Sequence, residues 1–222
     1  MYQNKNYMIT VKSFTFNPFS ENTYVVYDET KEALIIDPGC YENHEQEELD
    51  EFIKTQYLDV SLLLNTHCHI DHVLGNDFVK RKYNVPFLTH KLEEGMLRAV
   101  KAYAPNYGFT SYKEVMPDKF ISEKDEVTWG KSQFDVLFLP GHSPGHLGFY
   151  NPEQRILISG DVLFEGSIGR TDLPGGDMDT LIESIQQKLF ILPNEVIVYS
   201  GHGDTTTIGI EKVSNPFCAL SS

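Results

Sequence analysis

Four potential metal ligands occupy a stretch of six residues in this chain, directly after an apolar run typical of a buried strand. The run is residues 62–64, and the ligands are His67, His69, Asp71 and His72. Burying histidine or aspartate without a partner costs free energy, so packing alone explains this density poorly. In α/β proteins, polar side chains that follow a buried strand are presented at a sheet edge. The segment therefore indicates a metal site at such an edge, in preference to a histidine-rich surface loop.

Further residues of the ligand type stand where three other apolar runs end. His142 and His146 follow the run 134–139, Asp161 follows 156–158, and His202 follows 196–199. Glycines accompany each of them and permit tight turns and a close approach of the backbone. Ligands at four separate strand ends indicate one shared site with room for two metal ions.

The apolar pattern predicts many short strands interrupted by helices. Strands are expected at 8–16, 23–27, 33–36, 62–64, 85–89, 126–129, 134–138, 147–150, 156–159 and 195–199. Helices are expected at 45–55, 76–83, 91–104 and 179–188, the last capped by Asp179 or Thr180. The apolar residues of 105–125 show no clear helical or strand period, so an irregular surface segment is expected there. Because no repeat or low-complexity linker divides the chain, residues 1–222 are expected to form one domain of two packed sheets with helices outside.

Composition limits the partners and the compartment. The net charge of −14 argues against binding to nucleic acid or to an anionic membrane, and favours a small-molecule substrate. The chain has only three cysteines, an odd number that does not form a disulfide framework: Cys40, Cys68 and Cys218. No apolar signal core opens the chain, and no run approaches the ~20 apolar residues that span a bilayer. A cytoplasmic protein with reduced thiols is therefore expected, of unknown oligomeric state.

The ordered motifs resemble those of the metallo-β-lactamase superfamily. They are His67-x-His69-x-Asp71-His72, Gly141-His142-Ser143-Pro144-Gly145-His146, Gly160-Asp161 and Gly201-His202. The match is closest to the glyoxalase II-like branch, the hydroxyacylglutathione hydrolases and their short relatives, because Thr66 opens the first motif and the string FEGSIGRTD follows at 164–172. The resemblance implies an α+β fold, a four-layer αββα sandwich, with two metal ions at one edge.

Carried over residue by residue, the resemblance also implies a ligand set. His67, His69 and His146 would hold the first ion, Asp71, His72 and His202 the second, and Asp161 would bridge both. His142 matches the histidine of its motif that does not ligate, so a supporting role behind the ligands is expected for it. Imidazole and carboxylate suit Zn²⁺, with iron or manganese as alternatives.

The implied chemistry is hydrolysis by a metal-bridging hydroxide. Two divalent ions can lower the pKa of bound water from ~15.7 to about 7, which makes hydroxide available at neutral pH. Attack on a thioester or ester carbonyl is expected, with Asp71 helping to hold the nucleophile. Asp37 follows a strand and either orients a ligand histidine or simply forms an Asp-Pro-Gly turn. Arg170 either lines the substrate pocket or pairs with Asp172.

Two features leave the substrate open. Full-length glyoxalase II enzymes continue into a C-terminal helical domain that supplies basic residues for glutathione, whereas 20 residues follow His202 here, with Lys212 as their one basic residue. A thioester of another thiol is therefore plausible. Persulfide dioxygenases are also similar, including a Gly-Arg-Thr-Asp string like that at 169–172. They use a single iron held by two histidines and one aspartate, so a mononuclear iron dioxygenase is the alternative function.

Overall fold

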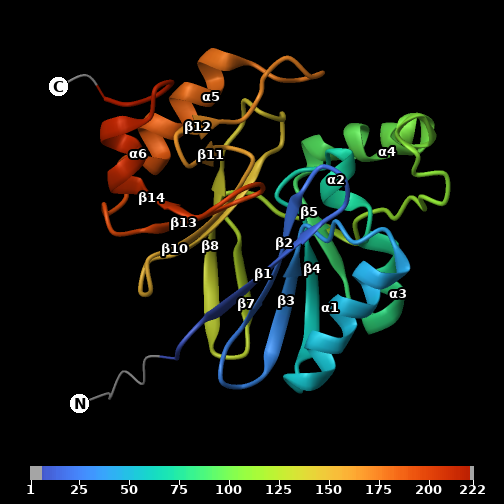
Figure 1. The fold of residues 1–222 in the computed structure, drawn as a ribbon. Helices are drawn as coiled ribbons and strands as arrows, with labels where there is room; N and C mark the ends of the chain where they lie inside the picture. Colours follow the sequence, from blue (N-terminus) through green and yellow to red (C-terminus); the bar gives the residue numbers. More distant parts are fainter. Residues whose placement is uncertain (1–6, 221–222) are drawn as a thin grey trace.

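Two twisted sheets face one another in the computed structural model, which describes residues 7–220 (Figure 1). The first sheet has the order β1-β2-β3-β4-β5-β6, with antiparallel pairing from β1 to β3 and parallel pairing from β3 to β6. Its strands are β1 (Thr10–Phe16), β2 (Glu21–Tyr27), β3 (Glu32–Ile36), β4 (Asp59–Leu64), β5 (Phe87–Thr89) and β6 (Lys119–Phe120).

The second sheet has the order β14-β13-β10-β9-β8-β7, in which β10 and β13 are parallel and the other neighbours antiparallel. Its strands are β7 (Glu126–Trp129), β8 (Ser132–Phe138), β9 (Leu147–Asn151), β10 (Ile156–Gly160), β13 (Ile197–Ser200) and β14 (Thr206–Thr207). A small hairpin, β11 (Leu163–Phe164) and β12 (Ser167–Ile168), follows β10.

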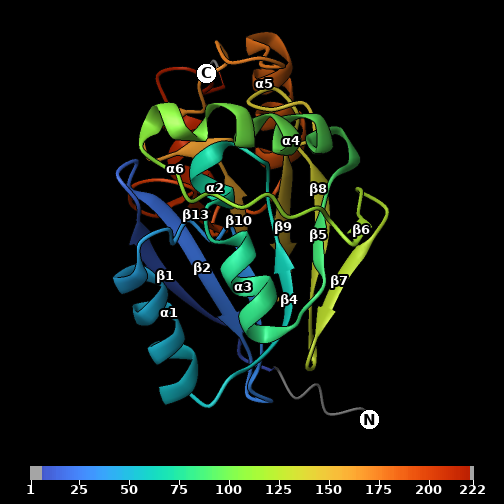
Figure 2. The same ribbon diagram turned by 90° about the vertical axis from the view of Figure 1, so that its right-hand side faces the viewer.

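Helices cover the outer face of each sheet, which completes four layers, and Figure 2 looks onto the helices that lie in front of the first sheet. The first sheet carries α1 (Asn43–Thr55), α3 (Asn76–Tyr83) and α4 (Glu94–Tyr103), and the second carries α5 (Met178–Ser184) and α6 (Ile208–Ser214). Shorter turns are α2 (Ile70–Val73), the 3₁₀ turns η1 (Lys91–Glu93) and η2 (Ala104–Tyr107), and the π turn η3 (Ile185–Leu189). The predicted αββα sandwich of the α+β class is confirmed.

Strand alternation separates the core into the spaces between these layers. Successive side chains of a strand point to opposite faces. Thus Leu63 packs with the helices over the first sheet, whereas Leu64 lies between the two sheets with Phe134 and Phe149. Such strands read as continuous apolar runs, because both of their faces are buried.

Most expected elements are present, with shifted ends. The helix expected at 91–104 divides into η1 and α4, and the region 105–125 contains η2 and β6. The expected cap of the helix at 179–188 was wrong. The cap is Asp177, which has an extended backbone and accepts a hydrogen bond from the amide of Thr180 at 2.8 Å.

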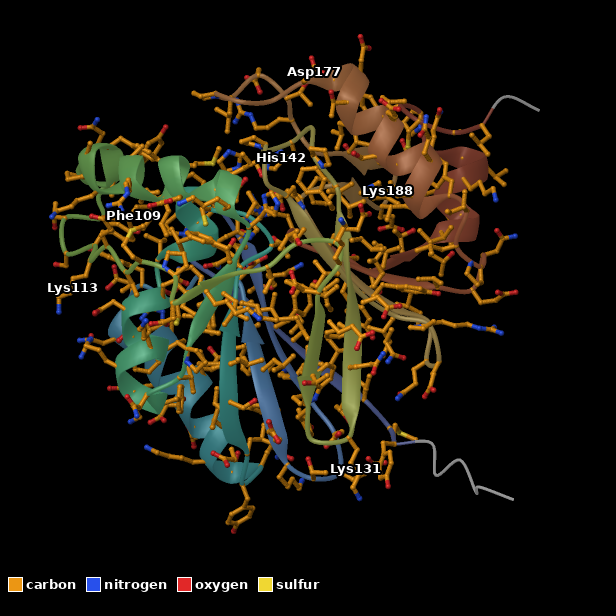
Figure 3. The ribbon with its side chains drawn as sticks, turned by 180° about the vertical axis from the view of Figure 1, so that it is seen from behind. Phe109, Lys113, Lys131, His142, Asp177 and Lys188 are labelled. Atoms are coloured by element: carbon orange, nitrogen blue, oxygen red, sulfur yellow. The ribbon has the colours of Figure 1, made fainter. Side chains whose placement is uncertain are left out.

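Strand β8 spans the molecule from the hairpin at Lys131 to the edge that carries His142 (Figure 3). None of the helices within residues 7–220 is long and apolar enough to cross a membrane.

Candidate metal centre

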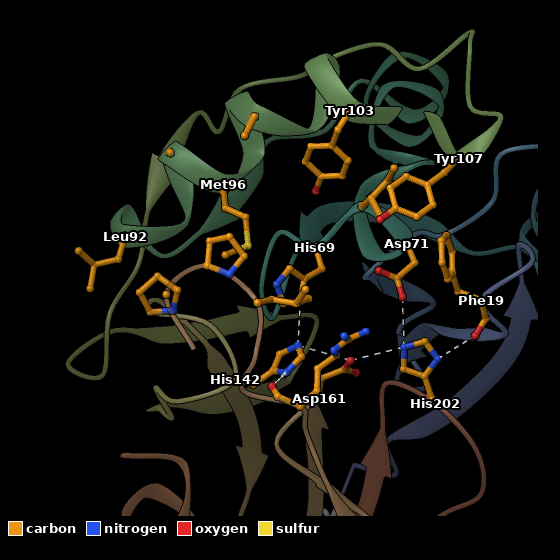
Figure 4. A pocket seen from close by; sticks show the side chains of 18 of the residues that line it. Phe19, His69, Asp71, Leu92, Met96, Tyr103, Tyr107, His142, Asp161 and His202 are labelled. Atoms are coloured by element: carbon orange, nitrogen blue, oxygen red, sulfur yellow. Dashed lines mark hydrogen bonds and ion pairs between the residues drawn. The ribbon is translucent and has the colours of Figure 1, made fainter. Parts of the chain in front are cut away.

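The predicted ligands come from four connections that leave the two sheets, and Figure 4 shows His69, Asp71, Asp161 and His202 among them. They come from the segment after β4 together with α2, which contains Asp71 and His72, from the β8–β9 connection, and from the ends of the parallel strands β10 and β13. Two glycines make this approach possible. A Cβ atom on Gly201 would lie 2.0 Å from Oδ1 of Asp161, and one on Gly160, which has a φ of +51°, would lie 2.4 Å from Oγ1 of Thr66. Any larger residue would therefore displace the site.

The first cluster of ligand atoms joins His67, His69 and His142. Nε2 of His142 lies 2.8 Å from Nδ1 of His69 and 3.3 Å from Nε2 of His67. The other ring nitrogen of His142, Nδ1, lies 2.7 Å from the carbonyl oxygen of Arg170 and donates to it. That hydrogen bond fixes the tautomer and leaves the lone pair of Nε2 directed at the cluster.

The second cluster joins Asp71, His72 and His202. Oδ2 of Asp71 lies 3.2 Å from Nε2 of His202 and 3.7 Å from Nε2 of His72. Nδ1 of His202 lies 3.1 Å from the carbonyl oxygen of Phe19 and donates to it, which directs Nε2 inward. Three ligand atoms of the types that divalent transition metals prefer thus converge a second time.

Asp161 lies between the two clusters and reaches both. Its Oδ1 is 3.4 Å from Nε2 of His72, and its Oδ2 is 3.4 Å from Nε2 of His202 and 3.6 Å from Nε2 of His142. Eight side-chain nitrogen or oxygen atoms in residues 7–220 are buried without a hydrogen-bond partner, and Nε2 of His72 and Oδ1 of Asp161 are two of them. Unpaired buried polar atoms are costly, so this donor set fits divalent metal ions, and Asp161 would be within reach of an ion held at either cluster.

His146 occupies a different position from the one expected. Its Nε2 accepts a hydrogen bond from the backbone amide of Asp161 at 3.1 Å, and its ring stacks on His67 with centroids 4.7 Å apart. We therefore propose a ligand set that differs from the expected one. In it, His142 would complete the first cluster, and His146 would support the turn that carries Asp161. The two histidines lie in one motif, and their hydrogen-bond partners distinguish them.

The electrostatics of the two clusters differ. Burial, reinforced by the adjacent His142, lowers the pKa of His69 to about 3, and burial also lowers that of His67 well below its usual value. These imidazoles are neutral at pH 7 and have free lone pairs. Burial opposes protonation of His202 as well, but hydrogen bonds to Asp161 and Asp71 outweigh it and raise its pKa to about 10. A metal ion in the second cluster would replace a proton there.

Asp37 supports the ligands from behind, so it does more than form a turn. Its Oδ1 accepts the backbone amide of Thr66 at 2.7 Å, its Oδ2 accepts the Thr66 hydroxyl at 2.6 Å, and Oδ2 lies 3.2 Å from Nδ1 of His72. The Asp37 backbone has a φ of +50°, in the left-handed region that is uncommon outside glycine. This strained conformation aims the carboxylate at the ligands.

The sequence reasoning missed two further buried carboxylates near the clusters. Glu93 in η1 accepts hydrogen bonds from the amide of Cys68, the hydroxyl of Ser143 and the amide of Gly145, at 2.8, 2.8 and 2.7 Å. Glu21 accepts the Thr23 hydroxyl at 2.9 Å, and burial raises its pKa well above the usual value. No local pattern marks either residue, because the partners of Glu93 are distant in the sequence and the burial of Glu21 results from the fold.

A cavity of about 1050 Å³ opens above the clusters and is lined by His69, Asp71, His142, Asp161 and His202. Arg170 lines it as well, and its guanidinium also pairs with Asp172 through two hydrogen bonds of 2.7 Å. Arg170 thus lines the cavity and pairs with Asp172 in the same conformation. Cys68 is buried in the core beside Thr89.

An αββα sandwich with a His/Asp cluster at one edge of its sheets defines a class of metal-dependent hydrolases. The chain belongs to the metallo-β-lactamase superfamily, whose family model matches residues 16–202. It is 39% identical to the hydroxyacylglutathione hydrolase GloC of Haemophilus influenzae, across 90% of this chain and 93% of that protein. These findings are consistent with the glyoxalase II-like branch.

Two solved structures share the fold over nearly their whole length. The BLEG-1 B3 metallo-β-lactamase is 38% identical, with a TM-score of 0.86 over 94% of this chain and 99% of that one. TTHA1623 in a di-iron-bound form is 36% identical, with a TM-score of 0.83 over 93% of this chain and 100% of that one.

Proposed function

We propose that this protein is a dinuclear metal-dependent hydrolase of thioesters or related esters. The observation that carries the proposal is the position of Asp161, whose two oxygens lie within 3.6 Å of ligand nitrogens in both clusters. Two bound divalent ions would lower the pKa of a water molecule to about 7 and polarise the substrate carbonyl. The donor set suits Zn²⁺ and also iron, the metal of the similar TTHA1623 structure.

The chain's own residues would position the attacking water, and its buried cysteine thiol does not compete as a nucleophile. We assign to Asp71 the positioning of the attacking water, because its carboxylate lines the cavity between His72 and His202. Cys68 is fully buried, and burial raises the pKa of its thiol well above the usual value, so it is not a competing nucleophile. A thiolate leaves readily without a general acid, which makes thioesters the best-matched substrates.

The alternative, a mononuclear iron persulfide dioxygenase, would need a single set of three ligands. The grouping of Asp71, His72 and His202 into a second set favours two ions. The GloC similarity supports a thioester substrate. The similarity to BLEG-1 makes a β-lactam the second substrate class to test.

The test is a substrate panel with protein of defined metal content. It contains S-lactoylglutathione, simple alkyl thioesters, an aryl ester and a chromogenic cephalosporin, and an oxygen electrode follows glutathione persulfide. We expect thioester hydrolysis without oxygen uptake. Oxygen uptake by protein that holds one iron per chain would contradict the proposal.

A matched pair of variants ties that activity to the site. Asp161→Ala should abolish turnover while far-UV circular dichroism stays unchanged, since only the side chain of Asp161 enters the clusters. Asp179→Ala, an exposed aspartate on α5, should retain the activity. Equal activity in both variants would remove Asp161 from the mechanism.

A further inference from the structure

The cavity above the clusters is walled by apolar side chains from two directions. From η1 and α4 come Leu92, Met96, Ala99 and Tyr103, and from beyond β10 come Phe164 and Leu173. Figure 4 shows Met96 and Tyr103 directed from the helix toward His69 and Asp71. Any group attached to a carbonyl that reacts at the clusters must therefore pass along an apolar surface.

Helix α4 is apolar on two sides. One side docks onto the first sheet through Leu97 and Val100, which are fully buried. Met96, Ala99 and Tyr103, spaced by three and four residues, form a second stripe that lines the cavity. A helix that only had to cover the sheet would need the first stripe alone. The second stripe lines the same cavity as the ligands, so a group that contacts this stripe would belong to a substrate bound at the clusters.

The cavity offers no uncompensated positive side chain. Among the described residues that line the cavity, Arg170 is the only lysine, arginine, aspartate or glutamate other than the ligands. Its guanidinium is already paired with the carboxylate of Asp172. The net charge of the chain is −14. Glutathione carries two carboxylates and a net negative charge at pH 7. Away from the clusters, the side chains that line the cavity provide no unpaired lysine or arginine for those carboxylates, and the long-range field repels them.

We propose that the cavity binds an apolar, uncharged chain of the thioester substrate, in preference to a glutathione moiety. This proposal rests on the proposed thioesterase function. The apolar chain can belong to the acyl half or to the thiol half, and both present the same hydrocarbon surface to α4.

Two substrate series distinguish these sources. The first holds the thiol constant as N-acetylcysteamine and lengthens the acyl group from acetyl to octanoyl. The second holds the acyl group as acetyl and lengthens an alkanethiol over the same range. We expect kcat/KM to rise about fourfold for each buried methylene in at least one series. We also expect the best member to exceed S-lactoylglutathione by tenfold or more.

Gly95 provides a variant that fills the cavity without disturbing the core. It lines the cavity on α4, and a Cβ atom there would have no heavy atom within 4 Å. Leucine also favours the helix more than glycine does. Gly95→Leu should lower the ratio of octanoyl to acetyl turnover by tenfold or more. Ala102→Leu is the control, because Ala102 is exposed on the same helix and is absent from the cavity wall. It should leave the ratio unchanged.

The outcomes separate this inference from the proposed function. If no thioester in either series or S-lactoylglutathione is hydrolysed, the proposed function fails. If thioesters are hydrolysed but kcat/KM is independent of chain length, or S-lactoylglutathione is the best substrate, the apolar-chain inference is overturned and the thioesterase function stands. A length dependence confined to one series assigns the apolar chain to that half of the substrate. An equal response of Gly95→Leu and Ala102→Leu would also overturn the inference.

Discussion

Asp37 lies 3.2 Å from Nδ1 of His72 and so holds a ligand of the second cluster through its Oδ2 atom. The same oxygen accepts the hydroxyl of Thr66 at 2.6 Å, and the Thr66 oxygen lies 3.0 Å from Nδ1 of His67 in the first cluster. One buried carboxylate therefore orients a histidine in each cluster. Partners of this kind raise the basicity of ligating imidazoles and fix their rings.

Removing the charge of Asp37 should weaken metal binding without removing a ligand. Asp37→Asn keeps the size of the side chain, and we expect metal affinity to fall about 10–100-fold. Competition with a chelator of known affinity measures the change. Asp59→Asn, at an exposed position at the start of β4, is the control. Equal affinities for the two variants would show that Asp37 is only a turn residue.

The exchange of roles between His142 and His146 is directly testable by metal analysis. His142→Ala should reduce the bound metal toward one ion per chain, because His142 Nε2 belongs to the first cluster. His146→Ala should retain two ions but lose about 1–3 kcal/mol of unfolding free energy, since it leaves the amide of Asp161 unpaired. If His146→Ala loses an ion and His142→Ala keeps both, the original assignment of these histidines is restored.

Glu93 joins the segments that carry His69 and His142, since it accepts the amides of Cys68 and Gly145. In Glu93→Gln, the side-chain NH₂ group would replace one carboxylate oxygen. It would face backbone N–H donors and could not accept a hydrogen bond from them. We expect a loss of about 1–3 kcal/mol in unfolding free energy and a lower kcat. Chemical denaturation and steady-state kinetics provide the two readouts. Glu94→Gln, next along the chain but paired with Lys91 and Arg98, should change neither quantity by much.

Asp28 joins the two sheets far from the site, which makes its contribution to stability separable from metal binding. Its carboxylate accepts the backbone amides of Thr30 and Lys131, each at 2.8 Å. Burial alone would raise its pKa, but these and the Thr30 and Ser132 hydroxyl bonds outweigh it and lower the pKa. Because the folded pKa lies below the unfolded value of ~3.9, the stabilisation is present above that pH and disappears as pH falls through the folded pKa.

Asp28→Asn should therefore lower the unfolding free energy of metal-free protein by about 1–3 kcal/mol at pH 7. The difference from the unsubstituted chain should shrink below pH 4. Urea unfolding at both pH values measures it. A difference that stayed constant down to pH 3 would mean that the charge of Asp28 is not what matters.

Local signals account for the parts of the fold and site that could be predicted. The helix at 76–83 and the strand at 126–129 agree with the structure at both ends, because each has a clear apolar period. The ligands from His67 to His72 were identifiable since four side chains that commonly ligate metals follow a buried strand. Such patterns depend on neighbours in the sequence.

The remaining features depend on contacts across the fold. His142 and His146 look alike in their motif, and only their bonds to the carbonyl of Arg170 and the amide of Asp161 distinguish them. Glu93 stands in a charged segment, and its burial follows from the segments that fold over it. The cap of α5 was misplaced because three aspartate or threonine candidates lie within four residues, and only Asp177 has the extended backbone of a cap.

The central claim is that two metal ions, bridged by Asp161, form the reaction centre. Its most direct test adds Zn²⁺ stepwise to metal-free protein and follows thioester hydrolysis against bound ions per chain. We predict that activity reaches its maximum at two ions per chain, and that Asp161→Ala gains no activity at any loading. Full activity at one ion per chain would contradict the account.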